Sequence, residues 1–442
     1  MAGGNWVTQD GVIPGAFINF TTDTQESISL AEQGVATMPL VLKWGKVKEF
    51  VMIDMNTNFM MVFGYDILDS ELILMKEALK RAKYLLVYRI SSGLKASKTV
   101  DNLTATARFE GSRGNDITVV VEADPDSEGG FIIATYCGTK EVDRQSGTEI
   151  EDLKDNDFVV WSGTGALSEN AGIKLEGGSN TAPNSGDYTD YFKACQLQKF
   201  NTIGLPVDDA TIKGAAAEFT KRMIETEGKK IQTIVPSYTT ADHEGIISVE
   251  NGVILSDETE IDKIKAVAWT AGATAAANLN EDLAYTAYED AVDVTERYES
   301  NKQIDDMLKA GKFFFVPKII NNKLKVVVQD DINTFTSLTK TKGREFHWNR
   351  SVRTMFDIGT TLPELWENRY IGKVDADSDG VDAFLGDAIE YFEKLQKMRA
   401  IKNFDSKEDI KVNIVDENSA YADVAVQVTK AFKKLYMNVR LK

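Results

Sequence analysis

The chain has 442 residues, of which 43% are hydrophobic and 27% are charged, and its formal net charge is −18. The length predicts about three domains, the hydrophobic share excludes a disordered chain, and the negative charge argues against non-specific binding to nucleic acid or anionic membranes. Cys137 and Cys195 lack CxxC spacing, which argues against a disulfide scaffold or zinc site. No signal peptide or membrane-spanning apolar run is found, so we expect a soluble protein that is not secreted.

The first segment, residues 1–20, has the pattern of a short N-terminal arm. Pro14-Gly15 predicts a turn, and alternation of apolar residues begins after it. Such an arm can pair within its own chain or with another chain. Its apolar residues are Ile13, Ala16, Phe17, Ile18 and Phe20.

Residues 21–95 are predicted to form a small α/β region that joins the core. The apolar run 59–63 favours a strand, and 84–90 favours a second, buried strand. Between them we expect a helix that begins near Asp69 or Ser70 as N-cap. A strand–helix–strand unit is therefore expected here.

Residues 96–185 differ in composition from the segments on either side. Strand-like runs at 117–121, 131–135 and 158–161 are separated by turns rich in Asp, Gly and Ser, and no helix is predicted. The pattern favours a β-sandwich or barrel inserted into an α/β chain. The polar stretch 177–186 predicts the boundary to the next domain.

Residues 186–335 alternate regularly between helix and strand patterns, which predicts a three-layer α/β domain. Asp187 is the expected cap of its first helix, and the helix at 260–278 is rich in small residues, which suits close packing on a sheet. The other predicted segments are strands at 201–205, 230–236, 313–316 and 323–329, and helices from Asp208 or Asp209 to Gly228 and at 302–309.

Residues 336–420 are predicted to form a mainly helical C-terminal domain, with helices at 350–370 and 381–399. In the last segment, 421–442, apolar and polar residues alternate. The apolar residues fall on even positions up to 428 and on odd positions from 435, so a bulge or turn is expected at 429–434. Two interpretations stay open: an edge strand within the chain, or a strand donated to a neighbouring subunit. The apolar faces comprise Ala422, Val424, Val426 and Val428, and then Leu435, Met437, Val439 and Leu441.

Catalytic motifs are weak in this sequence, which contains two histidines. Ser179 with His243 and Asp242 could be written as a hydrolase triad, but a polar loop and a surface histidine explain the pattern better. Gly163-Thr-Gly-Ala-Leu-Ser168 resembles the start of a dinucleotide fingerprint without its third glycine. We expect no catalytic residues and no cofactor.

Two further patterns could suggest a ligand. Asp375-Ala-Asp-Ser-Asp-Gly380 matches the first half of a calcium loop, but Gly386 stands where a bidentate Glu is required, so a capped turn before a helix is favoured. The basic and aromatic run 344–353 is interpreted as a helix start that makes ionic contacts within or between subunits, not as a nucleic-acid site. We expect no metal site.

Several stretches, in order along nearly the whole chain, resemble the contractile-tail sheath proteins of bacteriophages and phage-tail-like particles, particularly those of Gram-positive bacteria. The stretches are Ile13-Pro-Gly-Ala-Phe-Ile-Asn-Phe20, Ala107-Arg-Phe-Glu-Gly-Ser-Arg-Gly-Asn-Asp-Ile-Thr-Val119, Leu175-Glu-Gly-Gly-Ser-Asn180, Ala268-Trp-Thr-Ala-Gly-Ala-Thr-Ala-Ala276, Gln329-Asp-Asp-Ile-Asn-Thr-Phe-Thr336, Asn349-Arg-Ser-Val-Arg-Thr354, Tyr370-Ile-Gly-Lys-Val374 and Lys434-Leu-Tyr-Met-Asn-Val439. One departure is residues 366–377, where the family often has an Asn-rich turn.

The resemblance implies a structural protein with an α/β multidomain fold, α+β overall. Its central domain would be of the type called subtilisin-like, without a protease triad, and its β-sandwich would face outward. Terminal arms, here residues 12–20 and 421–441, would insert strands into neighbouring subunits.

The implied partners are further copies of the chain in ring and inter-ring contacts, an inner tail tube protein, and baseplate and tail terminator proteins, with neither nucleic acid nor membrane. The sheath would be assembled in the bacterial host cytoplasm and would contract to drive the tube through a cell envelope. A ligand- or ion-responsive binding module and an α/β hydrolase-like enzyme are the competing hypotheses.

Overall fold

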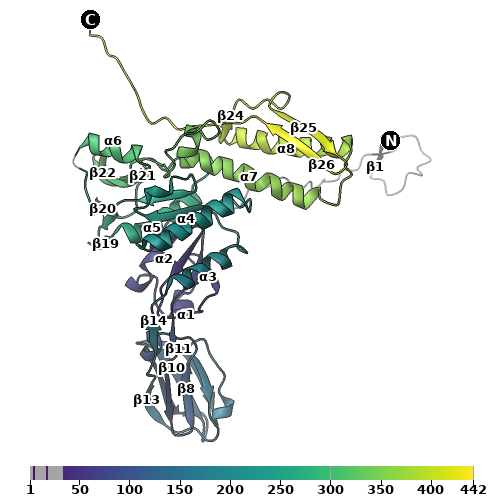
Figure 1. The fold of residues 1–442 in the computed structure, drawn as a ribbon. Helices are drawn as coiled ribbons and strands as arrows, with labels where there is room; N and C mark the ends of the chain where they lie inside the picture. The colour runs from purple at the N-terminus through teal and green to yellow at the C-terminus, as the bar shows by residue number, and fades with distance from the viewer. Residues whose placement is uncertain (1–2, 5–15, 18–32, 299, 442) are drawn as a thin grey trace.

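The computed structural model describes residues 3–4, 16–17, 33–298 and 300–441. The chain is a mixed α/β multidomain protein, with a β-sandwich at one end, a central α/β body, and a helical C-terminal part at the other end (Figure 1). Of the predicted N-terminal arm, Ile13, Ile18 and Phe20 lie outside the described residues. Ala16–Phe17 form β2, which pairs in parallel with β1, Gly3–Gly4.

The central body is built on a seven-stranded sheet with the order β21-β17-β16-β15-β3-β5-β4. All neighbouring pairs from β21 to β5 are parallel, and β4 at the edge is antiparallel to β5. Parallel strands need crossover connections, which place helices on the faces of the sheet. The strands are β3 Val35–Leu40, β4 Phe50–Ile53, β5 Tyr84–Arg89, β15 Thr202–Gly204, β16 Gln232–Pro236, β17 Ile246–Val249 and β21 Lys312–Phe313.

Helices cover both faces of this sheet. On one face α2, Ile73–Leu79, follows the short 3-10 helix Ser70–Leu72 and packs against α5, Lys263–Ala276. On the other face lie α3, Ser185–Cys195, and α4, Ala210–Glu225. The small-residue helix predicted near 260–278 is thus confirmed as α5. A Cβ atom on its Gly272 would lie 2.2 Å from the Ala78 carbonyl oxygen, so only glycine permits this approach of the two helices.

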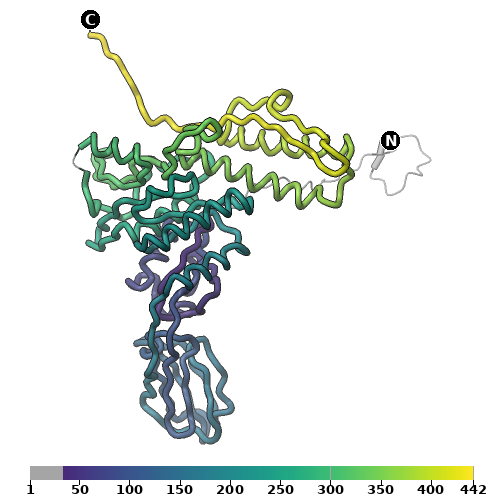
Figure 2. The backbone as a smooth tube through the Cα atoms, viewed as in Figure 1, coloured from purple at the N-terminus to yellow at the C-terminus, as the bar shows by residue number. Residues whose placement is uncertain are grey.

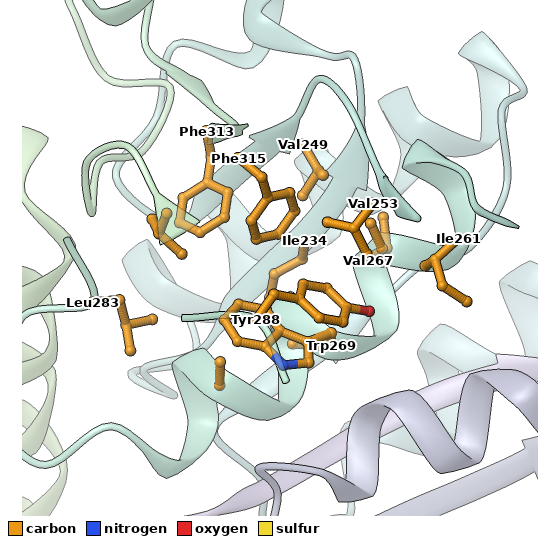
Figure 3. Packing of buried hydrophobic residues seen from close by; sticks show 14 of the residues in the cluster. Ile234, Val249, Val253, Ile261, Val267, Trp269, Leu283, Tyr288, Phe313 and Phe315 are labelled. Atoms are coloured by element: carbon orange, nitrogen blue, oxygen red, sulfur yellow. The ribbon is translucent and has the colours of Figure 1, made fainter. Parts of the chain in front are cut away.

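A large apolar cluster fills the space between α5, the sheet and a smaller sheet beside it (Figure 3). Trp269 of α5 stacks on Tyr288, with ring centroids 4.6 Å apart, and Phe315 meets both rings edge-on. The Trp269 indole N–H donates to Glu289 Oε2 at 2.6 Å, so its one polar atom is satisfied. The smaller sheet has the order β19-β18-β20 and contains β18 Val253–Leu255, β19 Glu260–Ile261 and β20 Ala291–Val294.

Two predictions about helices of the central body were wrong. Residues Phe59–Phe63 form helix α1 instead of a strand, because the Asn58 side chain caps it by accepting from the Met61 N–H and Gly64, at φ +71°, closes it. The cap of α3 is Asn184, and Asp187 instead completes the capping box by accepting from the Asn184 N–H at 2.8 Å.

The β-sandwich consists of one four-stranded sheet, β11-β10-β9-β13, facing a three-stranded sheet, β12-β8-β7, around a shared apolar core. It joins the body through a neck, the pair formed by β6, Ser92–Leu94, and β14, Ser179–Thr181 (Figure 2). A Cβ atom on Gly93 would lie 1.8 Å from the Ser179 carbonyl oxygen. The sandwich strands are β7 Ser97–Val100, β8 Leu103–Ala107, β9 Ile117–Ala123, β10 Phe131–Cys137, β11 Lys140–Gly147, β12 Val159–Ser162 and β13 Asn170–Lys174.

The C-terminal part is a pair of long helices, α7 Asn349–Arg369 and α8 Ser378–Lys397, covered by two short sheets. The central body ends in helix α6, Asn301–Lys309, and in a hairpin formed by β22, Phe315–Ile320, and β23, Lys323–Val328. Among the described residues, none of the helices has the length and apolar content that crossing a membrane requires.

Candidate assembly surface

The first half of the predicted terminal strand segment pairs within its own chain. β26, Ser419–Val424, is antiparallel to β25, Ile410–Asp416, and β27, Gln427–Val428, is antiparallel to β24, Ile401–Lys402. Each pair is a two-stranded sheet with no third strand in the described part of the chain. Val424 is packed partly against the C-terminal core, whereas Val426 remains 36% exposed. In the isolated chain, residues 421–428 therefore pair within the same chain. The outer edges of both two-stranded sheets remain open to a further strand.

The second half forms a tail that leaves the body. Residues 429–441 have no regular secondary structure, so the strand predicted at 435–441 is absent from the isolated chain. Figure 2 shows this tail extending away from the C-terminal part, without a neighbouring segment to supply ladder hydrogen bonds. Its apolar side chains lie in water: Leu435 is 86%, Met437 75%, Val439 67% and Leu441 94% exposed.

Two lysines hold the base of the tail on the body. Lys430 Nζ lies 2.8 Å from Glu345 Oε1 and 4.3 Å from the centre of the Trp348 ring. Lys433 Nζ bridges Asp282 Oδ2, at 3.1 Å, and Asp330. Burial disfavours the charge on Lys433, but the attraction of the Asp330 and Asp282 carboxylates outweighs it and raises the Lys433 pKa. The tail therefore leaves the body from a fixed point.

A buried polar junction joins α7 to the central body. Arg353 Nη2 donates to Asp331 Oδ2 at 2.8 Å and to the Glu281 carbonyl at 2.8 Å. Asn349 Nδ2 donates to Asp331 Oδ1 at 2.9 Å, and the Leu283 N–H donates to Oδ2 at 3.1 Å. Burial opposes the charge of Asp331, but the Arg353 guanidinium and these donors lower its pKa. The basic run 344–353 thus makes ionic contacts inside the subunit, as expected.

Both histidines lie where the central body connects to the C-terminal part. The His243 carbonyl accepts from Thr334 Oγ1 at 3.0 Å, and His347 Nδ1 lies 2.6 Å from the Phe335 carbonyl oxygen. Asp242 Oδ1 accepts from the Thr336 N–H at 2.7 Å, which fixes the start of the linking loop. His243 is buried, with 5% of its surface exposed, so the surface histidine expected from the sequence is wrong at this position. Burial lowers the pKa of both imidazoles.

The catalytic and ligand candidates do not assemble into a site. Ser179 pairs with Leu94 in the neck, whereas His243 accepts from the Gly245 N–H through Nδ1 and faces Glu225 through Nε2 at 3.4 Å. The loop from Gly163 leads from β12 to β13 with no helix after it. Asp377 Oδ1 accepts from the Gly380 N–H at 2.9 Å as the N-cap of α8, so the capped turn is confirmed.

Four protein-family models match consecutive parts of the chain. They are described as tail sheath protein Gp18 domain III N-terminal region, residues 33–90, phage tail sheath protein beta-sandwich domain, residues 91–180, phage tail sheath protein central domain, residues 181–334, and phage tail sheath C-terminal domain, residues 341–442. The phage-like element PBSX protein XkdK of Bacillus subtilis is 34% identical over 469 residues, covering 100% of both chains.

The chain belongs to the phage tail sheath protein family.

Solved structures agree with this assignment. A sheath tail protein from Desulfitobacterium hafniense is 41% identical, covers 97% of this chain with 100% of its own, and superposes with a TM-score of 0.86. The helical sheath of the anti-feeding prophage in its contracted state shares the fold at 9% identity, with 98% and 100% of the two chains covered and a TM-score of 0.58.

The protein is thus a structural tail sheath subunit and a component of a phage tail or phage-like particle, not an enzyme. Sequence reasoning missed the contacts of Lys430 and Lys433 with the body. The sequence did show that the apolar alternation shifts by one position at 429–434, which indicated a bulge or turn there. It gave no indication of the carboxylates that the two lysines contact.

Proposed function

We propose that the chain polymerises into a helical sheath around an inner tail tube and contracts to drive that tube through a target envelope. The partners would be further copies of the chain, the tube protein, and the baseplate and terminator proteins. The contracted sheath that shares this fold supports the idea that the fold is compatible with contraction.

The observation that carries the proposal is the exposed C-terminal tail. Leu435, Met437, Val439 and Leu441 would share one face if residues 435–441 became a strand. Burial of this face would remove apolar surface that lies almost fully in water in the isolated subunit. A second copy can supply the missing partner, because β25–β26 and β24–β27 keep open edges.

The N-terminal arm would take part in the same exchange through Ile13, Ala16, Phe17, Ile18 and Phe20. On the C-terminal side, Val424 and Val428 already pair within the chain, with Ile410 and Ile401. They would therefore belong to the receiving surface, and the tail after Lys433 would be the donated segment. Val426 would lie at the boundary between them.

Exchange of strands would keep subunits connected while their bodies reorient. Separating two strands requires several backbone hydrogen bonds and one apolar face to be lost together. Residues 429–434 at the base of the tail would supply one joint once the Lys430 and Lys433 contacts are released, and 20–23 would supply another in the N-terminal arm. Contraction would then lead to a second packing of lower free energy, reached when the baseplate removes a kinetic barrier.

We also propose the domain division derived from the sequence: arms at 1–20 and 421–442, and domains at 21–95, 96–185, 186–335 and 336–420, the 96–185 sandwich facing outward. The subtilisin-like topology of the central domain stays a prediction.

The test compares three forms of the full chain, each produced with the inner tube protein and inspected by negative-stain electron microscopy. One form is unmodified, the second carries serine at 435, 437, 439 and 441, and the third carries serine at the polar positions Asn438 and Arg440. We expect cylinders from the first and third forms and none from the second. Equal assembly of all three forms would refute strand donation by the tail, and no assembly of the unmodified chain would refute the sheath polymer.

A further inference from the structure

The β22–β23 hairpin carries a cluster of positive charge, in which Lys318 Nζ lies 5.5 Å from the centre of the Tyr285 ring. Residues 317–326 contain three lysines, Lys318, Lys323 and Lys325, and no acidic residue. Lys323 and Lys325 are exposed and form no ion pair within the described residues, in a chain whose net charge is −18. Lys318 lies directly across the hairpin from Lys325. Like charges in this position destabilise a strand pair, so an anionic partner would relieve their repulsion.

The opposite face of the same hairpin is apolar out to its tip. Phe315, Val326 and Val328 on this face are fully buried in the core. The next pair on this face, Ile319 and Leu324, lies past the core and is 77% and 54% exposed. A partner that meets the hairpin end-on would therefore contact two apolar side chains and the lysine ammonium groups together. Pro317, which has no N–H, makes β22 unsuitable for edge-to-edge strand addition.

The turn between α7 and α8, at the opposite end of the upper part of the molecule (Figure 1), carries negative charge that is complementary to these lysines. This turn, together with the first residues of α8, contains four aspartates and one lysine in residues 371–382. Ile371 and Val374 beside them are 58% and 40% exposed. Asp375 and Asp379 form no ion pair within the described chain, and both are exposed. Acidic charge and exposed apolar side chains thus occur together here as well.

This turn is closed by aromatic packing between its two helices. Trp366 stacks on Tyr370 with centroids 5.3 Å apart, and Phe384 of α8 meets both rings edge-on. A Cβ atom on Gly380 would lie 2.2 Å from the Asp375 carbonyl oxygen, so the turn is tightly closed. A preformed surface loses little conformational entropy when it is bound.

We propose that the β22–β23 hairpin of one subunit docks against the α7–α8 turn of a neighbouring copy. The two surfaces lie at opposite ends of the upper part of the molecule in Figure 1, with β22 on one side and the free ends of α7 and α8 on the other. The contact is therefore heterologous and repeats from copy to copy, in a ring or a helix. It rests on the proposed homopolymer, but it is separate from the terminal arms and adds a lateral contact between subunit bodies.

Charge reversal tests the electrostatic part of the contact. Lys323→Glu with Lys325→Glu, or Asp375→Lys with Asp379→Lys, is expected to raise the protein concentration needed for polymerisation by about tenfold or more, because like charges would then face each other. Combining all four substitutions should restore the concentration to near its original value. The matched control is Lys140→Glu with Lys174→Glu on the exposed sandwich surface, which changes net charge equally and should have no effect.

Site-specific cross-linking tests the geometry. Cys137 and Cys195 are buried, and burial raises the pKa of the Cys195 thiol to about 12, so neither native thiol competes for a bismaleimide reagent. A chain with Ile319→Cys and Val374→Cys should give a ladder of covalent oligomers when polymerised, and either single variant should give none.

Three results would overturn the inference. They are a dimer from Ile319→Cys alone, a cross-link from position 319 to the tube protein, or polymers of the double variant without any ladder. In the last case the unmodified chain would still form cylinders, and the proposed sheath function would stand. If the unmodified chain formed no polymer, the sheath function and this contact would fall together.

Discussion

Removal of the Arg353 guanidinium provides a direct test of the buried junction between α7 and the central body. Arg353→Met keeps much of the side-chain volume but leaves Asp331 charged, and the exposed fractions of these two side chains are 5% and 0%. Breaking a buried ion pair from one side costs about 3–5 kcal/mol. Asp331 would retain the Leu283 and Asn349 donors, at 3.1 and 2.9 Å, so we expect the lower end of this range.

The assay is hydrogen exchange of the backbone amides in α7, measured by mass spectrometry on the full chain. A loss of about 3 kcal/mol in the opening free energy corresponds to exchange faster by roughly a hundredfold. Peptides from the β-sandwich provide an internal control and should not change. Combining Arg353→Met with Asp331→Asn should cost less than the sum of the single changes. Unchanged α7 exchange in Arg353→Met would refute the assignment of this junction as the interdomain attachment.

Three further predictions concern other parts of the subunit. Burial lowers the pKa of His243 and His347, so the unfolded state binds more protons below about pH 6.5. The stability contributed by the two neutral imidazoles is therefore complete above that pH. It is lost progressively below it, so the melting temperature should fall as the pH drops towards the lowered folded-state pKa values. Gly272→Val places atoms against the Ala78 carbonyl and should cost about 1–3 kcal/mol in thermal unfolding. Lys433→Ala frees the base of the tail and should accelerate its cleavage by chymotrypsin by a few-fold.

Each of these predictions has a matched control. His243→Gln with His347→Gln should reduce the fall in melting temperature, and an unaltered pH dependence would contradict the assignment to these imidazoles. Gly386→Ala should be tolerated, because nothing lies within 4 Å of the added methyl group. Lys434→Ala, next to the bridging lysine, should leave cleavage unchanged, and equal acceleration by both lysine variants would argue against a specific anchor.

The sequence predicted the long periodic elements well, and the errors have physical reasons. The apolar run at Phe59–Phe63 is short enough to suit a buried strand or a helix, and only the flanking Asn58 and Gly64 distinguish the two. The strand β3, Val35–Leu40, was not predicted, and it contains Pro39, a residue that strands disfavour. It is accommodated because β15 pairs with β3 only at Ala36 and Thr37, so no neighbour needs an N–H at position 39 on that side.

The candidate surface was only partly predictable. Alternation at Leu435 to Leu441 identified apolar residues that need a partner, but a strand also requires a second strand, which the isolated chain does not supply. The buried pair of Asp331 and Arg353 joins residues from two domains. No local pattern encodes such a contact, because its partners meet only after both domains have folded.

The neck of the molecule carries both chain connections of the β-sandwich. The chain enters and leaves the sandwich through one three-residue strand pair, from Ser92↔Thr181 to Leu94↔Ser179. All strands of the seven-stranded sheet lie outside this insertion. A foreign domain whose ends lie ~4.8 Å apart, one strand spacing, would leave this sheet intact. It would also have to cover Trp44 and Met60, which the body contributes to the sandwich core. Every copy in a polymer would then carry the same cargo at a regular interval, so the neck is a natural grafting point for display.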